Sequence, residues 1–300
     1  MKKNILVVGG TGFIGYHLLK KLDKKQFNLL SISTKYPIKK KKIKKVKYLI
    51  CDISNYKVLK KKLKGLNINY VINLGGYINH SNIKKTKKSH LDGCVNLINY
   101  FKYKKISNFI QVGSSLEYGP RSTPHSEKNL NCNPVGNYGL SKLKATEFLK
   151  KNGKNYKLPF TILRLYQIYG PYQTVDRLVP MVINKFLSDK NFPCTEGNQI
   201  RDFLYINDLI DLFLIIIGKK KAFNQIFNVG SGKKIKIRAL IQKIQKKINK
   251  GKPLFGKIKM RKDEVLSYTP NLNKIKKFYT WSSKVSLDNG LNKTIQHYEK

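Results

Sequence analysis

The chain has 300 residues, of which 41% are hydrophobic and 26% are charged, and its formal net charge is +45. Its length is near the upper limit for a single core, so we expect a main domain with a smaller lobe. Four scattered cysteines argue against a zinc site or a disulfide framework, so we expect no metal and a reducing cytoplasm. The longest apolar run, residues 212–217, is too short for membrane insertion.

Lysine supplies most of the charge, in runs such as residues 39–42, 60–62 and 219–221. Nucleic acid or an anionic membrane surface is one interpretation of such a basic chain. However, the runs fall where helices and loops should be exposed, and they lack the interleaved aromatic residues of a platform for single strands. We therefore interpret them as solvated faces and expect no specific nucleic acid partner. A non-catalytic, nucleic-acid-associated or regulatory protein stays the distant alternative.

The first element in chain order is a short apolar strand, residues 5–8, which a glycine-rich turn joins to an amphipathic helix, residues 13–22. Glycine at such a turn permits a tight bend, close approach of a pyrophosphate, and packing of the helix on the sheet. The exposed amides at the start of the helix favour an anion. The turn therefore predicts a dinucleotide site. Its expected cofactor-binding residues are Gly9, Gly12, Phe13, Ile14 and Gly15.

Strand-like and helix-like segments alternate along the next part of the chain. The predicted strands are residues 27–33, 46–51, 71–74, 108–112 and 160–166, and the predicted helices are residues 56–63, 88–103 and 141–151. This alternation predicts an α/β fold with a doubly wound parallel sheet of the Rossmann type. We expect residues 1–170 to form the NAD(P)-binding domain, with its sheet completed by about 205–230. Residues 171–204 and 231–300 would form the smaller C-terminal substrate-binding lobe.

A tyrosine and a lysine four residues apart, Tyr138 and Lys142, are expected on one face of a helix. A lysine ammonium beside a tyrosine hydroxyl favours the phenolate, which suits proton transfer in an alcohol-to-ketone reaction. Ser114 follows a predicted strand at the carboxyl edge of the sheet, where ligands bind in open α/β folds. We predict that Ser114, Tyr138 and Lys142 are catalytic, and that Tyr138 and Lys142 also contact the cofactor.

These motifs resemble the extended short-chain dehydrogenase/reductase family, in its nucleotide-sugar epimerase, dehydratase and reductase branch. The resemblance runs nearly end to end and includes later segments that simple short-chain dehydrogenases lack. The matching segments are residues 52–53, 73–76, 118–119, 164–171, 201–205, 227–232, 261–265 and 287–291, together with Trp281. The resemblance implies a lobe that binds a nucleoside-diphosphate sugar. Members of the family often pair through a helix bundle that contains the tyrosine helix, so a homodimer is one option, and the sequence leaves the oligomeric state open.

The resemblance also implies further site residues. Those expected at the cofactor are Asp52, Ile53, Leu74 and Gly75, and those expected at the substrate are Ser115, Gln167, Arg201 and Arg261. In this lysine-rich chain, arginine persists at 164, 201 and 261, where a planar guanidinium suits bidentate phosphate contacts. A structural ion pair is the alternative for each arginine. His80 and His90 flank a segment expected to line the sugar pocket, and for both we favour a surface or packing role.

The residues after Ser114 reduce the number of reactions that fit the sequence. Dehydratases that resemble this chain place an acidic pair directly after the catalytic serine or threonine, where this chain has Ser115 and Leu116. Glu117 lies one place too far along and is expected to face away. A dehydratase is therefore disfavoured. Related enzymes that also epimerise beside a keto group need an extra proton-transfer residue, in one arrangement a cysteine where this chain has Leu116, so a 3,5-epimerase is disfavoured as well. The two reactions that remain are reduction of a 4-keto sugar and 4-epimerisation through a transient ketone.

The end of the second strand indicates which dinucleotide is used. An acidic residue there accepts hydrogen bonds from the ribose hydroxyls of the adenosine. This chain instead has Ser33, Thr34 and Lys35, which suit a 2′-phosphate, so we expect NADP(H) to be favoured over NAD(H). Because NADPH suits net reduction, a nucleotide-linked 4-keto-6-deoxyhexose reductase is the leading prediction. An NAD-dependent nucleotide-sugar 4-epimerase is the alternative.

Overall fold

The computed structural model describes residues 2–77, 79, 81–129, 131–261 and 264–299. The chain divides into two compact units. The first unit contains Met1–Gly119, Glu127–Arg164 and Ile210–Phe227, and the second contains Pro120–Ser126, Leu165–Leu209 and Asn228–Lys300. Each unit is therefore assembled from segments that are far apart in the sequence.

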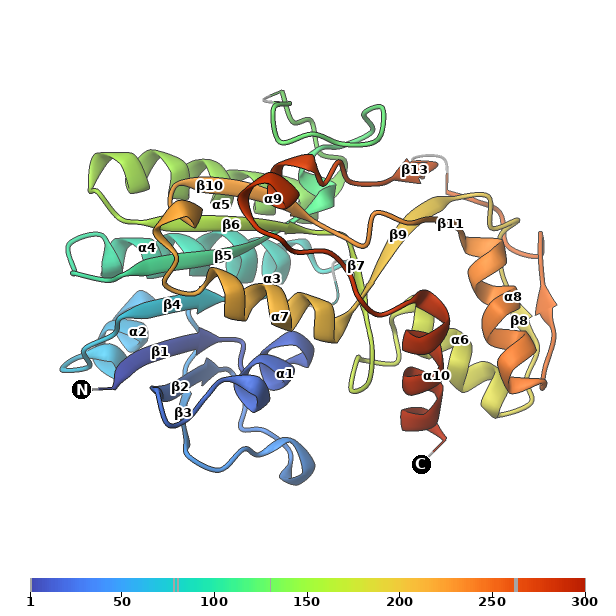
Figure 1. Cartoon of the computed structure of the whole chain (residues 1–300), viewed down its shortest axis with the longest axis horizontal. Helices are drawn as coiled ribbons and strands as arrows, with labels where there is room; N and C mark the ends of the chain where they lie inside the picture. The colour runs from blue at the N-terminus through green and yellow to red at the C-terminus, as the bar shows by residue number, and fades with distance from the viewer. Residues whose placement is uncertain (1, 78, 80, 130, 262–263, 300) are drawn as a thin grey trace. The chain divides into compact units, whose positions relative to one another are not determined.

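A seven-stranded sheet forms the centre of the first unit, with the strand order β10-β6-β5-β4-β1-β2-β3 (Figure 1). The strands are β1 (Lys3–Val8), β2 (Phe27–Ser33), β3 (Val46–Ile50), β4 (Tyr70–Asn73), β5 (Asn108–Ser114), β6 (Phe160–Leu165) and β10 (Gln225–Val229). The pairs β1–β2, β1–β4, β2–β3 and β4–β5 are parallel. The expected doubly wound parallel sheet is confirmed.

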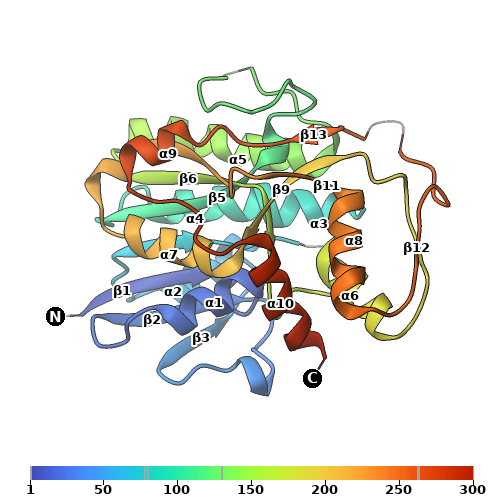
Figure 2. The ribbon, with the colours of Figure 1, turned by 45° about the vertical axis from the view of Figure 1, so that its right-hand side comes forward.

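Helices cover both faces of this sheet, with α2, α4 and α5 on one face and α1 with the first-unit part of α7 on the other (Figures 1 and 2). The helices are α1 (Phe13–Lys21), α2 (Tyr56–Leu63), α3 (Ile83–Lys87), α4 (Gly93–Phe101), α5 (Gly136–Asn155) and α7 (Ile206–Ile216). Shorter helical turns lie at Lys39–Lys41, Lys88–Asp92, Ser115–Glu117 and Lys220–Ala222. Because the sheet is covered on both sides, its central strands are buried on both faces, and all seven residues of β5 are buried.

The predicted helix at residues 88–103 differs from the structure in one respect. Residues Lys88–Asp92 form a π-helical turn, and the regular helix α4 begins only at Gly93. Such a turn adds a residue to one helical turn, and it is often found at functional sites. Apolar spacing could not reveal this turn, because its five residues, KSHLD, include only one apolar residue, Leu91.

The second unit is built around β9 (Ile200–Tyr205), which pairs antiparallel with β11 (Lys234–Lys236) and parallel with β13 (Ser267–Tyr268) and β7 (Gln167–Tyr169). Strands β8 (Phe192–Pro193) and β12 (Pro253–Leu254) form a separate parallel pair. The helices of this unit, apart from the start of α7, are α6 (Leu178–Leu187), α8 (Ile237–Ile248), α9 (Asn273–Phe278) and α10 (Leu287–Tyr298).

Within the described residues, no helix combines the length and the apolar character that crossing a membrane requires.

Candidate active site

The glycine-rich turn lies between β1 and α1, and its glycines occupy positions where a side chain does not fit. Gly9 has a φ of +78°, and a Cβ there would lie 3.0 Å from the backbone of Leu74. A Cβ on Gly15 would lie 2.3 Å from the carbonyl oxygen of Gly9, closer than real Cβ contacts come. The turn is therefore a cradle with a bare backbone surface, which fits the expected approach of a pyrophosphate.

Gly12 caps the start of α1 without a side-chain hydrogen bond, and the first turn of the helix carries no acidic residue. Glycine has no side chain that could accept hydrogen bonds from the first amides of the helix, which include those of Phe13 and Ile14. Amides of this kind, at the positive end of the helix dipole, favour an anion. The backbone and the helix together fit the diphosphate of a dinucleotide.

Ser33 ends β2 beside this cradle. Its hydroxyl donates a hydrogen bond to the carbonyl of Ile32 at 2.8 Å and accepts one from the amide of Thr11 at 3.3 Å. Lys35 lies two residues further along and is exposed. No carboxylate lies at the end of this strand. The position expected to bond the ribose hydroxyls of the cofactor holds the Ser33 hydroxyl instead, and the Lys35 cation follows two residues later.

The ends of β3 and β4 complete the same edge of the sheet. Asp52 is exposed and its carboxylate accepts a hydrogen bond from the amide of Ser54 at 2.9 Å. Ile53 is buried, and its side chain lies 3.3 Å from the position that a Cβ on Gly75 would take. The adjoining Leu74 is half-buried. The expected cofactor residues of four strands thus lie at one edge, because parallel strands end on the same side.

Ser114 is the last residue of β5, and it also caps the following turn, Ser115–Glu117. Its hydroxyl accepts a hydrogen bond from the amide of Leu116 at 3.2 Å, and its own amide donates to Glu117 at 2.8 Å. The side chains of Ser114 and Ser115 are 6% and 3% exposed. The capping box holds Ser114 in one orientation at the carboxyl end of the strand.

Tyr138 and Lys142 both lie on α5, as their spacing predicts. The Lys142 ammonium donates a hydrogen bond to the carbonyl of Val112 on β5 at 2.8 Å, and it lies 6.0 Å from the centre of the Tyr138 ring. Gly139 lets the helix come close to the Ser114 turn, since a Cβ there would lie 2.7 Å from the carbonyl oxygen of Leu116. The structure therefore brings the serine, tyrosine and lysine to one region of the first unit.

The guanidinium of Arg164, one of the three arginines considered for phosphate binding, forms a buried ion pair. Its Nε lies 2.8 Å from the Glu117 carboxylate, and the two side chains are 4% and 0% exposed. Burial alone would lower the pKa of Arg164, but the Glu117 carboxylate raises it above its ordinary value. Arg164 is thus a buried structural partner of Glu117, and the bidentate phosphate contact inferred for it is wrong. Thr146 also donates to this carboxylate at 3.0 Å.

His90 lies in the π-helical turn and is 6% exposed. Its ring meets the Tyr138 ring edge-on, with centroids 4.9 Å apart, and its Nε2 lies 3.1 Å from the carbonyl oxygen of Tyr77. Gly76 leaves room for this imidazole, because a Cβ there would lie 2.1 Å from it. His90 therefore packs in the core beside the expected catalytic tyrosine, while His80 lies outside the described residues.

Of the four expected substrate residues, Ser115 lies in the first unit and the other three lie in the second, where two of them line one cavity. Gln167 and Arg201 line a cavity of about 320 Å³, and Gln167 is exposed. The Arg201 guanidinium is paired with Glu264 and donates to the carbonyl of Val265 at 2.9 Å. Burial lowers the pKa of Arg201, although Glu264 acts in the opposite direction. Arg261 is exposed and is not among the residues that line this cavity.

Two residues with a supporting role were not singled out from the sequence. Gly139 stands between Tyr138 and Lys142, where its small size was an available signal for a close approach. Glu264 follows Arg261 by three residues, but only the fold shows that it pairs with Arg201. Among the described residues, no group of three or more histidine, cysteine or acidic side chains could hold a metal ion.

A protein-family model described as "NAD dependent epimerase/dehydratase family" matches residues 5–230. The chain belongs to the NAD dependent epimerase/dehydratase family. The family is part of the extended short-chain dehydrogenases/reductases, so the resemblance seen in the motifs is confirmed, and the chain is an enzyme of that type. The match includes the glycine turn, Ser114, and the Tyr138 and Lys142 pair.

Individual relatives of this epimerase/dehydratase family member cover nearly all of its length. CDP-abequose synthase from Salmonella muenchen is 26% identical over 100% of this chain and 99% of the relative. The dTDP-4-dehydro-6-deoxyglucose reductase from Escherichia coli is 28% identical over 98% and 97% of the two chains. The crystal structure of UDP-glucose 4-epimerase from Thermotoga maritima superposes with a TM-score of 0.91 at 23% identity and covers 98% of each chain.

Proposed function

We propose that this family member is an NADP(H)-dependent reductase of a nucleoside-diphosphate 4-keto-6-deoxyhexose. One observation argues against a dehydratase, and the proposed NADP(H) preference then favours a reductase over an epimerase. The only carboxylate near Ser114 in the 114–117 turn belongs to Glu117, and it is fully buried against Arg164. No acid in this turn is therefore available to remove or donate the protons that elimination of water requires. The resemblance to a relative that is named as a 4-dehydro-6-deoxyglucose reductase supports the same choice.

The three expected catalytic residues have distinct tasks in this reaction. When it is bound, the reduced nicotinamide supplies the hydride. Tyr138 donates a proton to the oxygen of the sugar ketone, and Ser114 donates a hydrogen bond to the same oxygen. Lys142 would hold the nicotinamide ribose, and its ammonium lies 6.0 Å from the centre of the Tyr138 ring. The hydrogen bond from Lys142 to Val112 fixes the ammonium near the end of β5.

The preference for NADP(H) rests on the end of β2. Ser33 and the exposed Lys35 offer a hydroxyl and a cation to a 2′-phosphate, and this strand end offers no carboxylate to the ribose hydroxyls. The family description supports a nicotinamide dinucleotide in general. The preference for the phosphorylated form is our proposal.

The second unit would bind the nucleoside-diphosphate part of the substrate. Its cavity contains the amide of Gln167 and the guanidinium of Arg201, which suit a diphosphate or a base. Because Arg201 is paired with Glu264, substrate binding through Arg201 requires it to exchange that carboxylate for a phosphate. The exposed Arg261 is available for a further phosphate contact.

A 4-epimerisation is the alternative, since the same three residues would serve it. In that reaction Tyr138 first removes the proton of the 4-hydroxyl and later returns it. The cofactor would then be NAD that is retained through the cycle, whereas a reductase exchanges its cofactor at each turnover.

The decisive experiment titrates the purified, nucleic-acid-free protein with NADPH and NADH, and it also identifies any dinucleotide released by denaturation. We expect exchangeable binding that favours NADPH, and oxidation of NADPH when a nucleoside-diphosphate 4-keto-6-deoxyhexose is added. The matched control is Tyr138→Phe, which should bind NADPH normally and lose about 10²–10⁴-fold in turnover. Retained, non-exchanging NAD would favour the epimerase, and near-normal turnover of Tyr138→Phe would exclude both reactions.

We also propose that the enzyme is cytoplasmic and forms a homodimer through α5. The exposed Leu140, next to the catalytic region of that helix, supports such a contact. Analytical ultracentrifugation of wild type and Leu140→Lys tests the dimer, because a lysine pair at the contact should shift the protein toward the monomer.

A further inference from the structure

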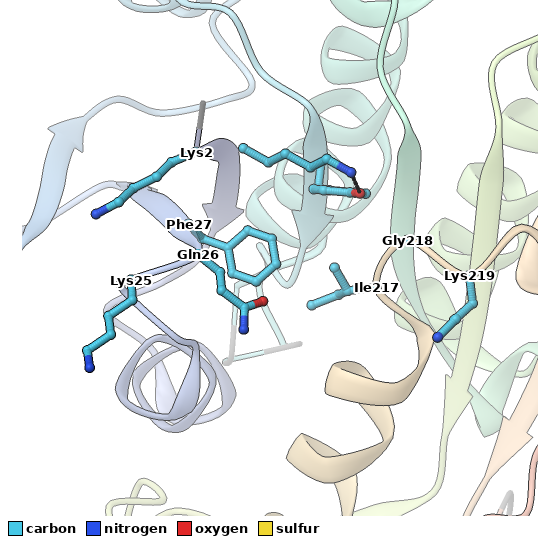
Figure 3. A pocket seen from close by; sticks show the side chains of 9 residues that line it. Lys2, Lys25, Gln26, Phe27, Ile217, Gly218 and Lys219 are labelled. Atoms are coloured by element: carbon cyan, nitrogen blue, oxygen red, sulfur yellow. Dashed lines mark hydrogen bonds between the residues drawn. The ribbon is translucent and has the colours of Figure 1, made fainter.

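A second cavity of about 690 Å³ lies in the first unit, where β1, β2 and β4 begin (Figure 3). Its lining includes the first residue of each strand: Lys3, Phe27 and Tyr70. The turn after α7 contributes Gly218 and Lys219. The cavity is therefore made by segments that are far apart in the sequence and that only the parallel sheet brings together.

This cavity is distinct from the cofactor cradle. The register pairs Lys3 with Phe27 at the start of β1 and β2, and pairs Val8 with Ile32 near their ends. The glycine turn follows Val8, so the six residues of β1 separate the two sites. A strand rises about 3.3 Å per residue, so the separation is on the order of 15–20 Å. One dinucleotide in the cradle does not occupy both sites.

Positive charge surrounds the cavity. Among the residues that the structure describes, four lysines, at positions 2, 3, 25 and 219, line it, and no acidic residue does. Lys2 and Lys25 lie on one side of the Phe27 ring and Lys219 on the other (Figure 3). All four side chains are exposed, so they can swing toward a ligand. An arrangement of cations on two sides, without a neutralising carboxylate, favours a ligand with several negative charges.

The floor between these lysines is aromatic. The rings of Phe27 and Tyr70 meet edge-on, with centroids 6.4 Å apart. The Tyr70 hydroxyl accepts a hydrogen bond from the Lys3 ammonium at 3.4 Å, although Tyr70 is only 4% exposed. Gly218, with a φ of +78°, leaves room for this hydroxyl, because a Cβ there would lie 3.0 Å from it. The half-buried Phe27 thus offers a face on which a planar group can stack.

We infer that this cavity, which we name the amino-edge site, binds a nucleoside polyphosphate. The lysine ammonium groups would bind the polyphosphate chain through charge, and the base would stack on the Phe27 ring, as bases do on aromatic side chains. Its volume lies within the range of small-molecule sites. This binding is additional to the cofactor and to the substrate of the proposed reaction, and it does not depend on either of them.

The test uses the full chain with saturating NADPH, so that the cofactor cradle is filled, and it measures ATP binding by calorimetry at moderate salt. The test variant is Lys2→Gln/Lys25→Gln/Lys219→Gln. The matched control is Lys60→Gln/Lys61→Gln/Lys62→Gln, which removes the same charge from exposed positions of α2 outside the cavity. We expect the test variant to weaken ATP binding at least about tenfold and the control to change it less than about twofold.

A second probe tests the aromatic floor. Tripolyphosphate carries the charge of the ATP chain without a base, so we expect ATP to bind at least about tenfold more tightly. Equal losses in the two triple variants would overturn the site, because the binding would then follow bulk charge. An unchanged test variant would place the ATP elsewhere, and equal binding of ATP and tripolyphosphate would exclude a nucleoside. Thermal unfolding of each variant, followed by circular dichroism, checks that the fold is intact.

Discussion

We propose that both edges of the parallel sheet bind anions, and the two edges differ in the groups that they offer. At the carboxyl edge the cradle is bare backbone, and Ser114 and Lys142 are buried and held by hydrogen bonds. At the amino edge the cations are exposed lysines above an aromatic floor. The first edge depends on shape, and a Cβ on Gly15 would destroy it. The second depends on charge, so it should tolerate single substitutions and respond strongly to salt.

The largest expected effect concerns the support beneath the carboxyl edge. Glu117→Gln leaves the buried Arg164 guanidinium without its carboxylate, and should lower the free energy of unfolding by about 3–5 kcal/mol. Urea denaturation followed by circular dichroism measures the loss. The double variant Glu117→Gln/Arg164→Met should recover part of it, because the uncompensated charge is gone. A loss below about 1 kcal/mol would mean that the ion pair does not support the Ser114 turn.

The next prediction tests whether a substitution at the carboxyl edge changes ligand binding at that edge alone. Gly15→Ala places a methyl group against the Gly9 carbonyl, so we expect a loss of about 1–3 kcal/mol in stability and a clear loss of NADPH affinity. ATP binding at the amino-edge site should stay within about twofold, since that site is at the other end of the strands. Calorimetry with each ligand makes the comparison. Parallel losses at both sites would show that the two edges are energetically linked.

Substitution of His90 tests how far the orientation of the Tyr138 ring depends on its contact with the His90 ring. An edge-on aromatic contact contributes about 0.5–1.5 kcal/mol, so His90→Ala should lower kcat by about 2–10-fold and leave the KM for NADPH unchanged. His90→Phe keeps the edge contact and should restore part of kcat. If Phe and Ala behave alike, the edge contact does not position the tyrosine.

A change of cofactor preference, comparable in size to the His90 effect, is the last prediction. Ser33→Asp/Lys35→Ala gives β2 the carboxylate that bonds ribose hydroxyls and removes the cation beside it, so the ratio of NADPH to NADH affinity should fall about tenfold. Lys40→Ala removes one charge from an exposed position in the Lys39–Lys41 turn and serves as the control. An unchanged ratio in the double variant would show that the 2′-phosphate is recognised elsewhere.

Local patterns were sufficient to predict the sheet and the carboxyl edge. The glycine turn, the apolar strands and the four-residue spacing of Tyr138 and Lys142 each lie within one short segment. Once parallel strands are assumed, their ends must meet at one edge. The positions of these residues could therefore be predicted from the sequence, although their roles stay proposals.

Features that depend on distant residues could not be predicted in this way. Arg164 and Glu117 are 47 positions apart, and nothing local marks their ion pair. The π-helical turn at His90 contains only one apolar residue, so no apolar period marks it in the sequence. The amino-edge site joins residues 2, 25, 70 and 219. In a chain with so many lysines, no local signal marks those that gather around one cavity.

The start of β1 at Lys3 has a practical consequence for protein production. Because Lys2 and Lys3 line the amino-edge site, an affinity tag fused to the N-terminus would begin beside its opening. A histidine-rich or acidic tag there would supply competing groups to the lysines and could mask nucleotide binding. Protein purified through a C-terminal tag, or with the N-terminal tag cleaved close to Lys2, is therefore the appropriate material for every ligand titration described above.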